Sequence, residues 1–233
     1  MNSEKILNVL NKLEVREESQ TDLENLKREL QADILTNGKI KSGILLTFKK
    51  YVKQNQKDGK PAFEHIFKSK NGNYAFTNGY FLLDWGNNKD NIPAELKAYV
   101  KDEETDKNFD FETFEDKITD KETKINVKEI EKIVKYNKFR CKEVGFCQGQ
   151  QPLLADINNE VYFNPKYFLD IIKITNSKEE KINVKYRTNI SPICFEINNV
   201  KCILLPVNLK TDNHIKQQRE EKENFEKLQK VED

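Results

Sequence analysis

The chain has 233 residues, of which 36% are hydrophobic and 34% charged, and its 40 basic residues nearly balance its 39 acidic ones. This composition is more polar than that of an average globular domain, yet 14 Phe and 8 Tyr supply enough apolar area for a core, which excludes a simply disordered chain. No apolar run approaches the roughly 20 residues of a membrane span, and residues 1–13 do not contain the hydrophobic stretch of a signal peptide. We therefore expect a cytoplasmic protein that does not interact with a membrane.

The residue types that carry metal or acid–base chemistry are few and scattered. The four cysteines have the spacings C-x5-C and C-x7-C, which match no usual zinc site, and His65 and His214 are isolated from each other. We expect reduced thiols, no metal, no cofactor and no catalytic residue. A nuclease that uses the acidic stretch 86–123 is the enzymatic alternative, but the acids there have no fixed spacing.

Charge is unevenly distributed along the chain. Residues 1–33 carry five basic and eight acidic groups, and residues 89–123 carry six basic and twelve acidic groups. By contrast, residues 39–60 carry seven Lys and one Asp, and residues 124–142 carry seven basic groups and two Glu. Two basic segments separated by an acidic one indicate an anion-facing surface on a nearly neutral protein.

Helical patterns dominate the first quarter of the chain. Residues 3–33 have leucines, isoleucines and valines at helical spacing, with a polar break at 17–21, and predict a packing or oligomerising helix pair. Asn37-Gly38 marks a turn. Residues 43–57 form the best amphipathic helix, with an apolar stripe on one face and lysines on another.

Strand and loop patterns follow. Residues 62–85 alternate in polarity, and Asn71-Gly72 and Asn78-Gly79 predict tight turns between strands. Residues 86–123 are expected to be a solvated connector that contains a short helix at 93–100 and a loop at 102–106.

From residue 124 the chain repeats itself. Residues 126–135 align with 164–173 at an offset of 38, with four identities, and residues 152–159 align with 192–199 at an offset of 40. Each copy begins its helix with an Asn, whose side chain can cap free backbone N–H groups. A unit of helix, strand, turn and strand is thus used at least twice, and residues 43–85 are a candidate third copy.

The second copy also contains two recognisable runs. Residues 161–173 read Val-Tyr-Phe-Asn-Pro-Lys-Tyr-Phe-Leu-Asp-Ile-Ile-Lys, a strand entering an Asn-started helix, and residues 202–209 read Cys-Ile-Leu-Leu-Pro-Val-Asn-Leu. They are similar to the "Y-x-L-D" helix and the Met-Pro-Met-Arg-Leu-like closing strand of the bacterial sliding clamp family, the beta subunit of DNA polymerase III. Residues 61–85 look like the first hairpin of that family.

The departures from the family are considerable. A bacterial clamp has three tandem domains and is much longer, Asn208 stands where the family has Arg, and 24 residues follow the family's usual end. An N-terminal helical arm is added as well. The resemblance therefore implies a diverged, shortened clamp-like protein, which we expect to come from a phage or mobile element.

The resemblance implies an α+β fold of DNA-clamp-like helix–strand–strand repeats, with the helices on one face of antiparallel sheet and extra terminal helices. The expected segments are a helical arm (1–36), a clamp-like unit with an acidic connector (37–122), clamp-like repeat units (123–209) and a helical or disordered tail (210–233). In the tail, Phe225 and Leu228 share one helix face, and the tail either frays, folds into the protein's own cleft or docks on a neighbouring subunit.

The function implied is a non-enzymatic, processivity-type protein that tethers to duplex DNA, independent of sequence, by self-assembling around it as a homo-oligomer. A polymerase or other replication protein would be its client. The alternative is a clamp-fold protein-interaction module that does not encircle DNA. The expected DNA-binding residues lie on the three helices of the repeats: Lys49, Lys50, Lys53, Lys57, Lys128, Lys132, Lys135, Lys138, Arg140, Lys166 and Lys173. The expected cleft for a client peptide is bordered by Leu204, Leu205, Pro206 and Val207.

Overall fold

The computed structural model describes residues 3–11, 13, 17–36, 42–60, 63–104, 120–143, 152–209 and 211–232. It confirms the α+β class. The chain divides into two compact units, of which the first comprises Met1–Asp110, Lys173–Ser177 and Asn198–Val200. The second comprises Phe111–Ile172, Lys178–Ile197 and Lys201–Asp233. The expected turn at Asn37-Gly38 and residues 105–119 of the expected connector lie outside the described residues.

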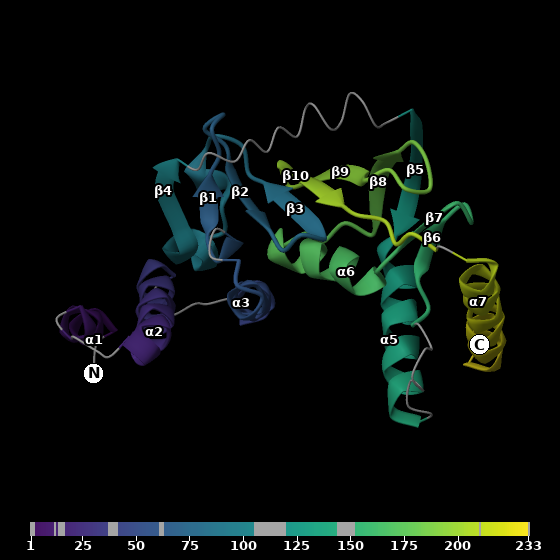
Figure 1. Cartoon of the computed structure of the whole chain (residues 1–233), viewed down its shortest axis with the longest axis horizontal. Coiled ribbons are helices and arrows are strands. Elements are labelled where there is room, and N and C mark those ends of the chain that lie inside the picture. The colour runs from purple at the N-terminus through teal and green to yellow at the C-terminus, as the bar shows by residue number, and fades with distance from the viewer. Residues whose placement is uncertain are drawn as a thin grey trace. The chain divides into compact units, whose positions relative to one another are not determined.

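The first unit combines helices with four neighbouring strands. Its helices are α1 (Ser3–Leu10), α2 (Glu17–Leu35) and α3 (Ser42–Lys57), with 3₁₀ helices η2 (Lys89–Asn91) and η3 (Ala94–Tyr99). Its strands are β1 (Ile66–Lys68), β2 (Tyr74–Thr77), β3 (Phe81–Asp84) and β4 (Val100–Glu104), in the spatial order β4-β1-β2-β3. Strands β1, β2 and β3 are antiparallel, β4 is parallel to β1, and α2 and α3 lie on one side of them (Figure 1).

The core of the first unit forms where the predicted apolar stripe of α3 meets the strands. Phe48 of α3 packs against Phe76 of β2 with 4.4 Å between ring centroids, and Tyr51 meets Phe81 of β3 edge-on at 4.9 Å. Gly79, in one of the predicted turns, has a φ of +87°, a conformation that glycine adopts without strain. The apolar periodicity of α3 and the predicted turn at Gly79 are therefore both consistent with the packing in the structure.

Strand β4 corrects the expectation of a loop at 102–106 for residues 102–104, and residues 105–106 lie outside the described residues. It pairs with β1, and the Tyr74 hydroxyl of β2 donates a hydrogen bond to Asp102 at 3.0 Å. The acidic sequence of β4 has no alternation of apolar and polar residues, so its conformation is set by a partner strand distant in sequence. Strand propensity depends on such context more than helix propensity does.

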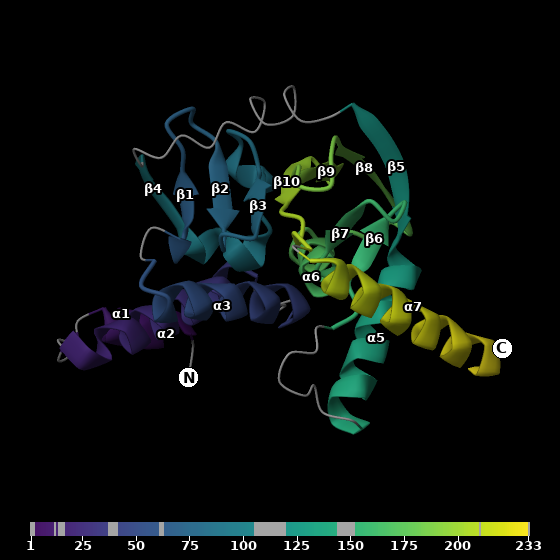
Figure 2. The ribbon, with the colours of Figure 1, turned by 45° about the vertical axis from the view of Figure 1, so that its right-hand side comes forward.

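The second unit begins with β5 (Lys121–Asn126) and α5 (Val127–Glu143). The elements that follow are β6 (Ala155–Ile157), β7 (Val161–Phe163), α6 (Pro165–Ile174), β8 (Lys181–Tyr186), β9 (Ile193–Ile197), β10 (Val200–Leu204) and α7 (Asp212–Glu232). Neighbouring strands follow the order β10-β9-β8-β5, and β6 and β7 form a separate antiparallel pair. In both ribbon views α5 and α6 lie on the same side of β5, β8 and β9 (Figure 1, Figure 2).

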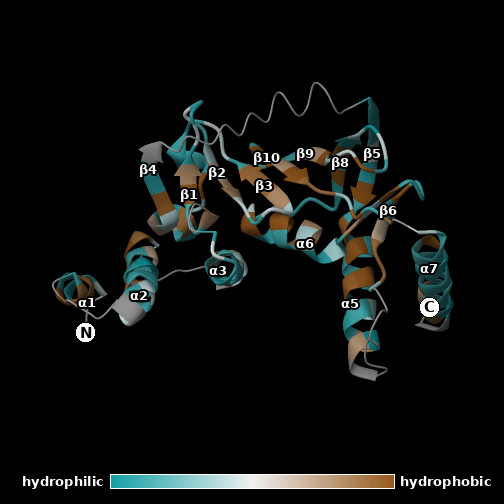
Figure 3. Ribbon diagram, viewed as in Figure 1, coloured by the Kyte–Doolittle hydropathy of each residue, from teal (hydrophilic) through white to brown (hydrophobic). Residues whose placement is uncertain are grey.

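Strand β8 shows how this unit divides core from solvent. Its residues alternate strictly between exposed and buried, so that only one face of the strand is covered. On the covered side, Phe168 of α6 packs against Phe195 of β9 and Phe163 of β7, at 5.4 and 5.7 Å between ring centroids. Strands β9 and β10 are largely apolar and α7 is largely polar (Figure 3).

Two local features of the predicted repeat occur in both copies, although in the second copy β8 stands between the helix and the aligned strand pair and no described residue of the first copy forms a matching strand. The backbone N–H of Lys128 donates to the Asn126 side chain at 3.0 Å, and that of Lys166 donates to Asn164 at 2.9 Å, so both helices are capped as predicted. The aligned Asn-Asn pairs at 158–159 and 198–199 both lie between consecutive strands with φ between +52° and +60°. Asn tolerates this left-handed conformation better than most residues, which explains why both copies have Asn there.

Candidate nucleic-acid interface

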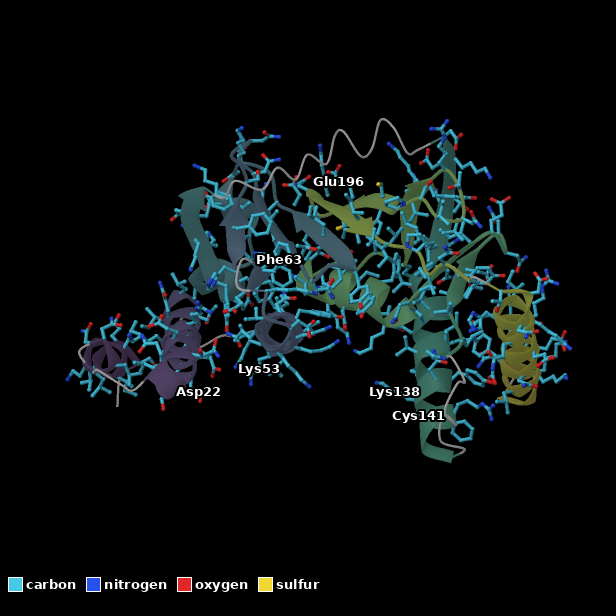
Figure 4. The ribbon with its side chains drawn as sticks, viewed as in Figure 1. Asp22, Lys53, Phe63, Lys138, Cys141 and Glu196 are labelled. Atoms are coloured by element: carbon cyan, nitrogen blue, oxygen red, sulfur yellow. The ribbon has the colours of Figure 1, made fainter. Side chains whose placement is uncertain are left out.

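Helix α3 presents only part of its expected basic set to solvent. Leu46, Lys50, Lys53 and Lys57 are exposed and follow one another at helical spacing, on the side opposite the buried stripe. Figure 4 labels Lys53 on the side of α3 away from the strands. Lys53 and Lys57 make no ion pair with a described residue, which leaves their ammonium groups available to an anion.

The other two lysines of α3 have intramolecular contacts. Lys49 forms an ion pair with Glu29 of α2, and its side chain is only 17% exposed. Lys50 lies with its Nζ 3.1 Å from the Tyr51 hydroxyl and 4.2 Å from the centroid of the same ring. The ion pair of Lys49 therefore links α3 to α2, and the ammonium group of Lys50 interacts with the Tyr51 ring.

Helix α5 carries the longest basic stripe. Val127 and Ile130 are buried on one side of the helix, and Tyr136 is buried on another side against Phe225 of α7. The outer face carries four exposed lysines at intervals of three or four residues: Lys128, Lys132, Lys135 and Lys138. The last three make no ion pair with a described residue. Lys138 is labelled towards the end of the helix in Figure 4.

Lys128 differs from the other three lysines of the stripe. Its Nζ lies 2.6 Å from Glu180, and this hydrogen bond raises the pKa of Lys128 and lowers the pKa of Glu180. Both side chains are about 70% exposed (69% and 71%), so water and salt weaken the pair. An approaching phosphate could therefore replace Glu180 at little cost.

Arg140 lies in a polar cluster between α5 and α7. Its guanidinium contacts Glu221 at 3.0 Å, and the Tyr136 hydroxyl donates to the same carboxylate at 2.7 Å. Burial first, and then the Glu221 carboxylate, raise the pKa of Tyr136 to about 12. Because its guanidinium binds Glu221, Arg140 links α5 to α7 and is not available to bind a ligand.

Helix α6 contributes two lysines with different surroundings. Lys166 pairs with Asp170 one turn later at 3.2 Å, and that carboxylate is only 3% exposed. Lys173, near the end of the helix, is exposed. Lys166 therefore neutralises a buried acid, and Lys173 is the accessible cation of this helix.

The residues expected to border a peptide cleft have unequal environments. Leu204 is fully buried, Leu205 is 42% exposed, and Pro206 and Val207 are half-buried. The Val207 N–H donates to the Tyr162 carbonyl at 2.7 Å. Of the four, Val207 lines a groove of about 480 Å³ whose other walls include Ile215 and Arg219 of α7.

The attachment of α7 was not evident from the sequence. Phe225 packs against Tyr136 of α5 at 5.4 Å, whereas Leu228 is 43% exposed. Gln218 is only 3% exposed and bonds the backbone of Leu154 and Pro152, while Lys222 reaches Asp156 at 2.8 Å. These anchors are mostly polar, so a search for apolar periodicity detects only Phe225.

The described part of the chain has neither a metal-binding cluster nor a spanning helix. No group of three or more His, Cys, Asp or Glu among these residues could hold a metal ion. None of the helices described is long and apolar enough to cross a membrane. Among the described cysteines, Cys194 and Cys202 are buried, Cys141 is exposed, and none of the three forms a disulfide.

Comparison with known proteins gives structural neighbours only. The sequence matches no protein-family model and no curated protein at a significant level. The structure is similar to a protein described as a DNA polymerase III beta subunit from Eubacterium rectale, with 14% identity and a TM-score of 0.40 over 60% of this chain and 55% of that one. It is also similar to the DNA polymerase sliding clamp of Bacillus subtilis, with 15% identity and a TM-score of 0.37 over 58% and 53% of the two chains. The matched part spans about half of each neighbour.

Proposed function

We propose that this chain is a non-enzymatic, clamp-like protein that tethers to duplex DNA by assembling copies of itself around it, with a polymerase or another replication protein as its client. The observation that supports this proposal is the outer face of α5, where Lys132, Lys135 and Lys138 are exposed without an ion pair to a described residue. The opposite face of the helix is packed on its own unit, so the lysines stay in solvent until a partner covers them.

The chemistry of this stripe suits phosphates rather than bases. Lysine ammonium groups act as mobile point charges, which neutralise phosphate oxygens without reading a base sequence. Lys53 and Lys57 on α3 offer the same chemistry in the first unit. Binding would therefore be independent of sequence and sensitive to salt.

Charge reversal tests the interaction with DNA. The double variant Lys132→Glu/Lys135→Glu should bind duplex DNA more weakly, and its log–log salt slope should fall by about 0.9 for each phosphate that is no longer neutralised. Lys227→Glu/Lys230→Glu, on exposed positions of α7, changes the net charge by the same amount and should bind as the wild type does. Equal binding by both double variants would contradict the proposed role of α5.

The assembly is tested by mass. A single chain would need copies of itself to enclose a duplex. Sedimentation should therefore detect a closed oligomer, either in the free protein or after DNA is added. A protein that stays monomeric at all concentrations, with and without DNA, would contradict encirclement.

The groove beside Val207 favours a second candidate, a protein-interaction module. Val207, Ile215 and Arg219 line this groove, and the remaining residues of the expected cleft precede it in the chain. The walls of the groove are mostly polar and carry two guanidinium groups, Arg187 and Arg219, beside the apolar Val207, Leu209 and Ile215, and a peptide offers both kinds of group to such a surface. Two results together would favour this candidate over the first. The protein would be a monomer that fails to bind DNA, and the Val207→Glu substitution would abolish its binding to a replication protein.

A further inference from the structure

Helix α5 holds an exposed aromatic ring within its lysine stripe. Phe139 is 52% exposed, although it is among the larger apolar side chains of the unit. It follows Lys135 by four residues and Lys132 by seven, so the helical repeat places all three on one face. Tyr136, the other aromatic residue of α5, lies one turn earlier on the neighbouring part of the helix surface, where it is buried against Phe225 of α7.

Single exposed apolar residues are common on proteins, so exposure alone does not distinguish Phe139. Its position among lysines does. Phenylalanine has no polar atom and cannot bind a phosphate, so it adds nothing to electrostatic attraction by a duplex backbone. The flat face of its ring can stack on a nucleobase. The bases of a duplex are stacked on one another, whereas a single strand leaves their faces accessible.

We infer that Phe139 stacks on an unpaired base while the neighbouring lysines hold the flanking phosphates. Cations that follow the backbone, combined with an aromatic platform for bases, are the two components of sequence-independent single-strand binding. The preferred DNA of α5 is therefore single-stranded, or duplex next to a single-stranded region. This inference rests on the proposed interaction of the α5 lysines with DNA, and it adds the class of DNA.

The test compares oligothymidine of about 16 nucleotides with a continuous duplex of similar length, by fluorescence anisotropy at one salt concentration. Phe139→Ala should weaken binding of the single strand by roughly 5- to 150-fold, the range for removal of one base stack, and leave duplex binding within about twofold. Since the ring is half in solvent, the variant should melt at the wild-type temperature. Tyr80→Ala is the matched control, because Tyr80 is 50% exposed on the turn between β2 and β3 and belongs to the other unit of the chain.

Two further substitutions separate stacking from simple apolar packing. Phe139→Trp keeps an aromatic face and should retain single-strand binding, whereas Phe139→Leu keeps apolar area without such a face and should weaken it as Phe139→Ala does. Wild-type affinity of the Leu variant for the single strand, or an unchanged affinity of the Ala variant, would overturn the inference. Failure of the lysine reversals to weaken any DNA binding would instead overturn the proposed function.

Discussion

Two side-chain amides hold the segment 152–154 from different helices. Asn137 of α5 exchanges two hydrogen bonds of 2.9 Å with the backbone of Leu153. Gln218 of α7 accepts from the Leu154 N–H at 2.8 Å and donates to the Pro152 carbonyl at 3.0 Å. The amides thus satisfy backbone groups that a neighbouring strand would otherwise bond, as buried polar groups require.

Replacing Gln218 should be costly because its partners are buried. Gln218→Ala leaves the Leu154 N–H without an acceptor and should lower the free energy of unfolding by about 1–3 kcal/mol. Gln217→Ala is the matched control, since Gln217 precedes it on the same helix and makes no hydrogen bond to a described residue. Urea unfolding followed by circular dichroism measures both variants, and equal values would show that Gln218 is not an anchor.

His65 lies in a setting that disfavours its protonated form. It is 7% exposed, and burial first, then the positive charges of Arg28 and Lys101, lower the pKa of His65 to about 3. In the unfolded chain the pKa returns to its ordinary value of about 6.5. Below that pH the unfolded state binds the extra proton, so the stability conferred by neutral His65 is present above pH 6.5 and is lost as pH falls towards 3.

The consequence is a pH-dependent stability that one substitution should remove. Between about pH 6.5 and 4, His65 should lower the free energy of unfolding by up to about 1.4 kcal/mol for each pH unit. His65→Gln should flatten this slope, measured by urea unfolding with the fluorescence of Trp85, a fully buried reporter in the same unit. His214→Gln is the control, and an acid slope that persists unchanged in His65→Gln would disprove the assignment.

At the scale of elements, local signals and packing agree in the three helices of the repeats. The stripe of α3, the Asn caps of α5 and α6, and the Gly and Asn turns were all readable because each depends on residues within a few positions of one another. Strand β4 and the contacts of α7 were not readable, because they depend on partners far along the chain. Asp102 and Gln218 are polar and resemble any solvated residue until their partners are known.

The caps offer a direct test at this scale. Asn164→Ala removes the acceptor for the Lys166 N–H and should lower stability by about 1 kcal/mol. Asn164→Asp keeps an acceptor and places a negative charge at the positive end of the helix, so it should be neutral or slightly stabilising. Thermal unfolding compares the two, and an Ala variant as stable as the wild type, or an Asp variant as destabilised as the Ala variant, would contradict the role of the side-chain acceptor.

At the scale of the whole molecule, the sequence identified which helices carry the basic charge, but not which charges are available. Composition marks residues 39–60 and 124–142 as basic, yet Lys49 and Arg140 in these segments are committed to Glu29 and Glu221, and Lys166 of α6 is likewise committed to Asp170. Those acids lie in α2, α6 and α7, and only the fold brings the two from α2 and α7 to their partners. The exposed set is therefore smaller than the basic set, which is why the reversal experiment uses Lys132 and Lys135.

Helix α7 allows a prediction about the stability of its unit as a whole. Its contacts come from Gln218, Glu221, Lys222 and Phe225, which reach α5 and the segment that leads into β6. Deleting residues 211–233 would leave the Leu154 N–H, Tyr136 and Arg140 without their partners and expose part of the Tyr136 ring. The full deletion should therefore lower the free energy of unfolding by more than Gln218→Ala alone, at least about 2 kcal/mol.

A graded truncation separates this effect from the mere removal of a terminus. Deleting only residues 227–233 keeps all four anchors and removes Leu228, which is 43% exposed, so this shorter truncation should unfold at nearly the same urea concentration as the full chain. Hydrogen exchange should then show faster exchange of the Leu154 amide in the full deletion only, because Gln218 is its acceptor. If both truncations unfolded together, or if the Leu154 amide were equally protected in both, α7 would be an appendage and not part of the structure of the second unit.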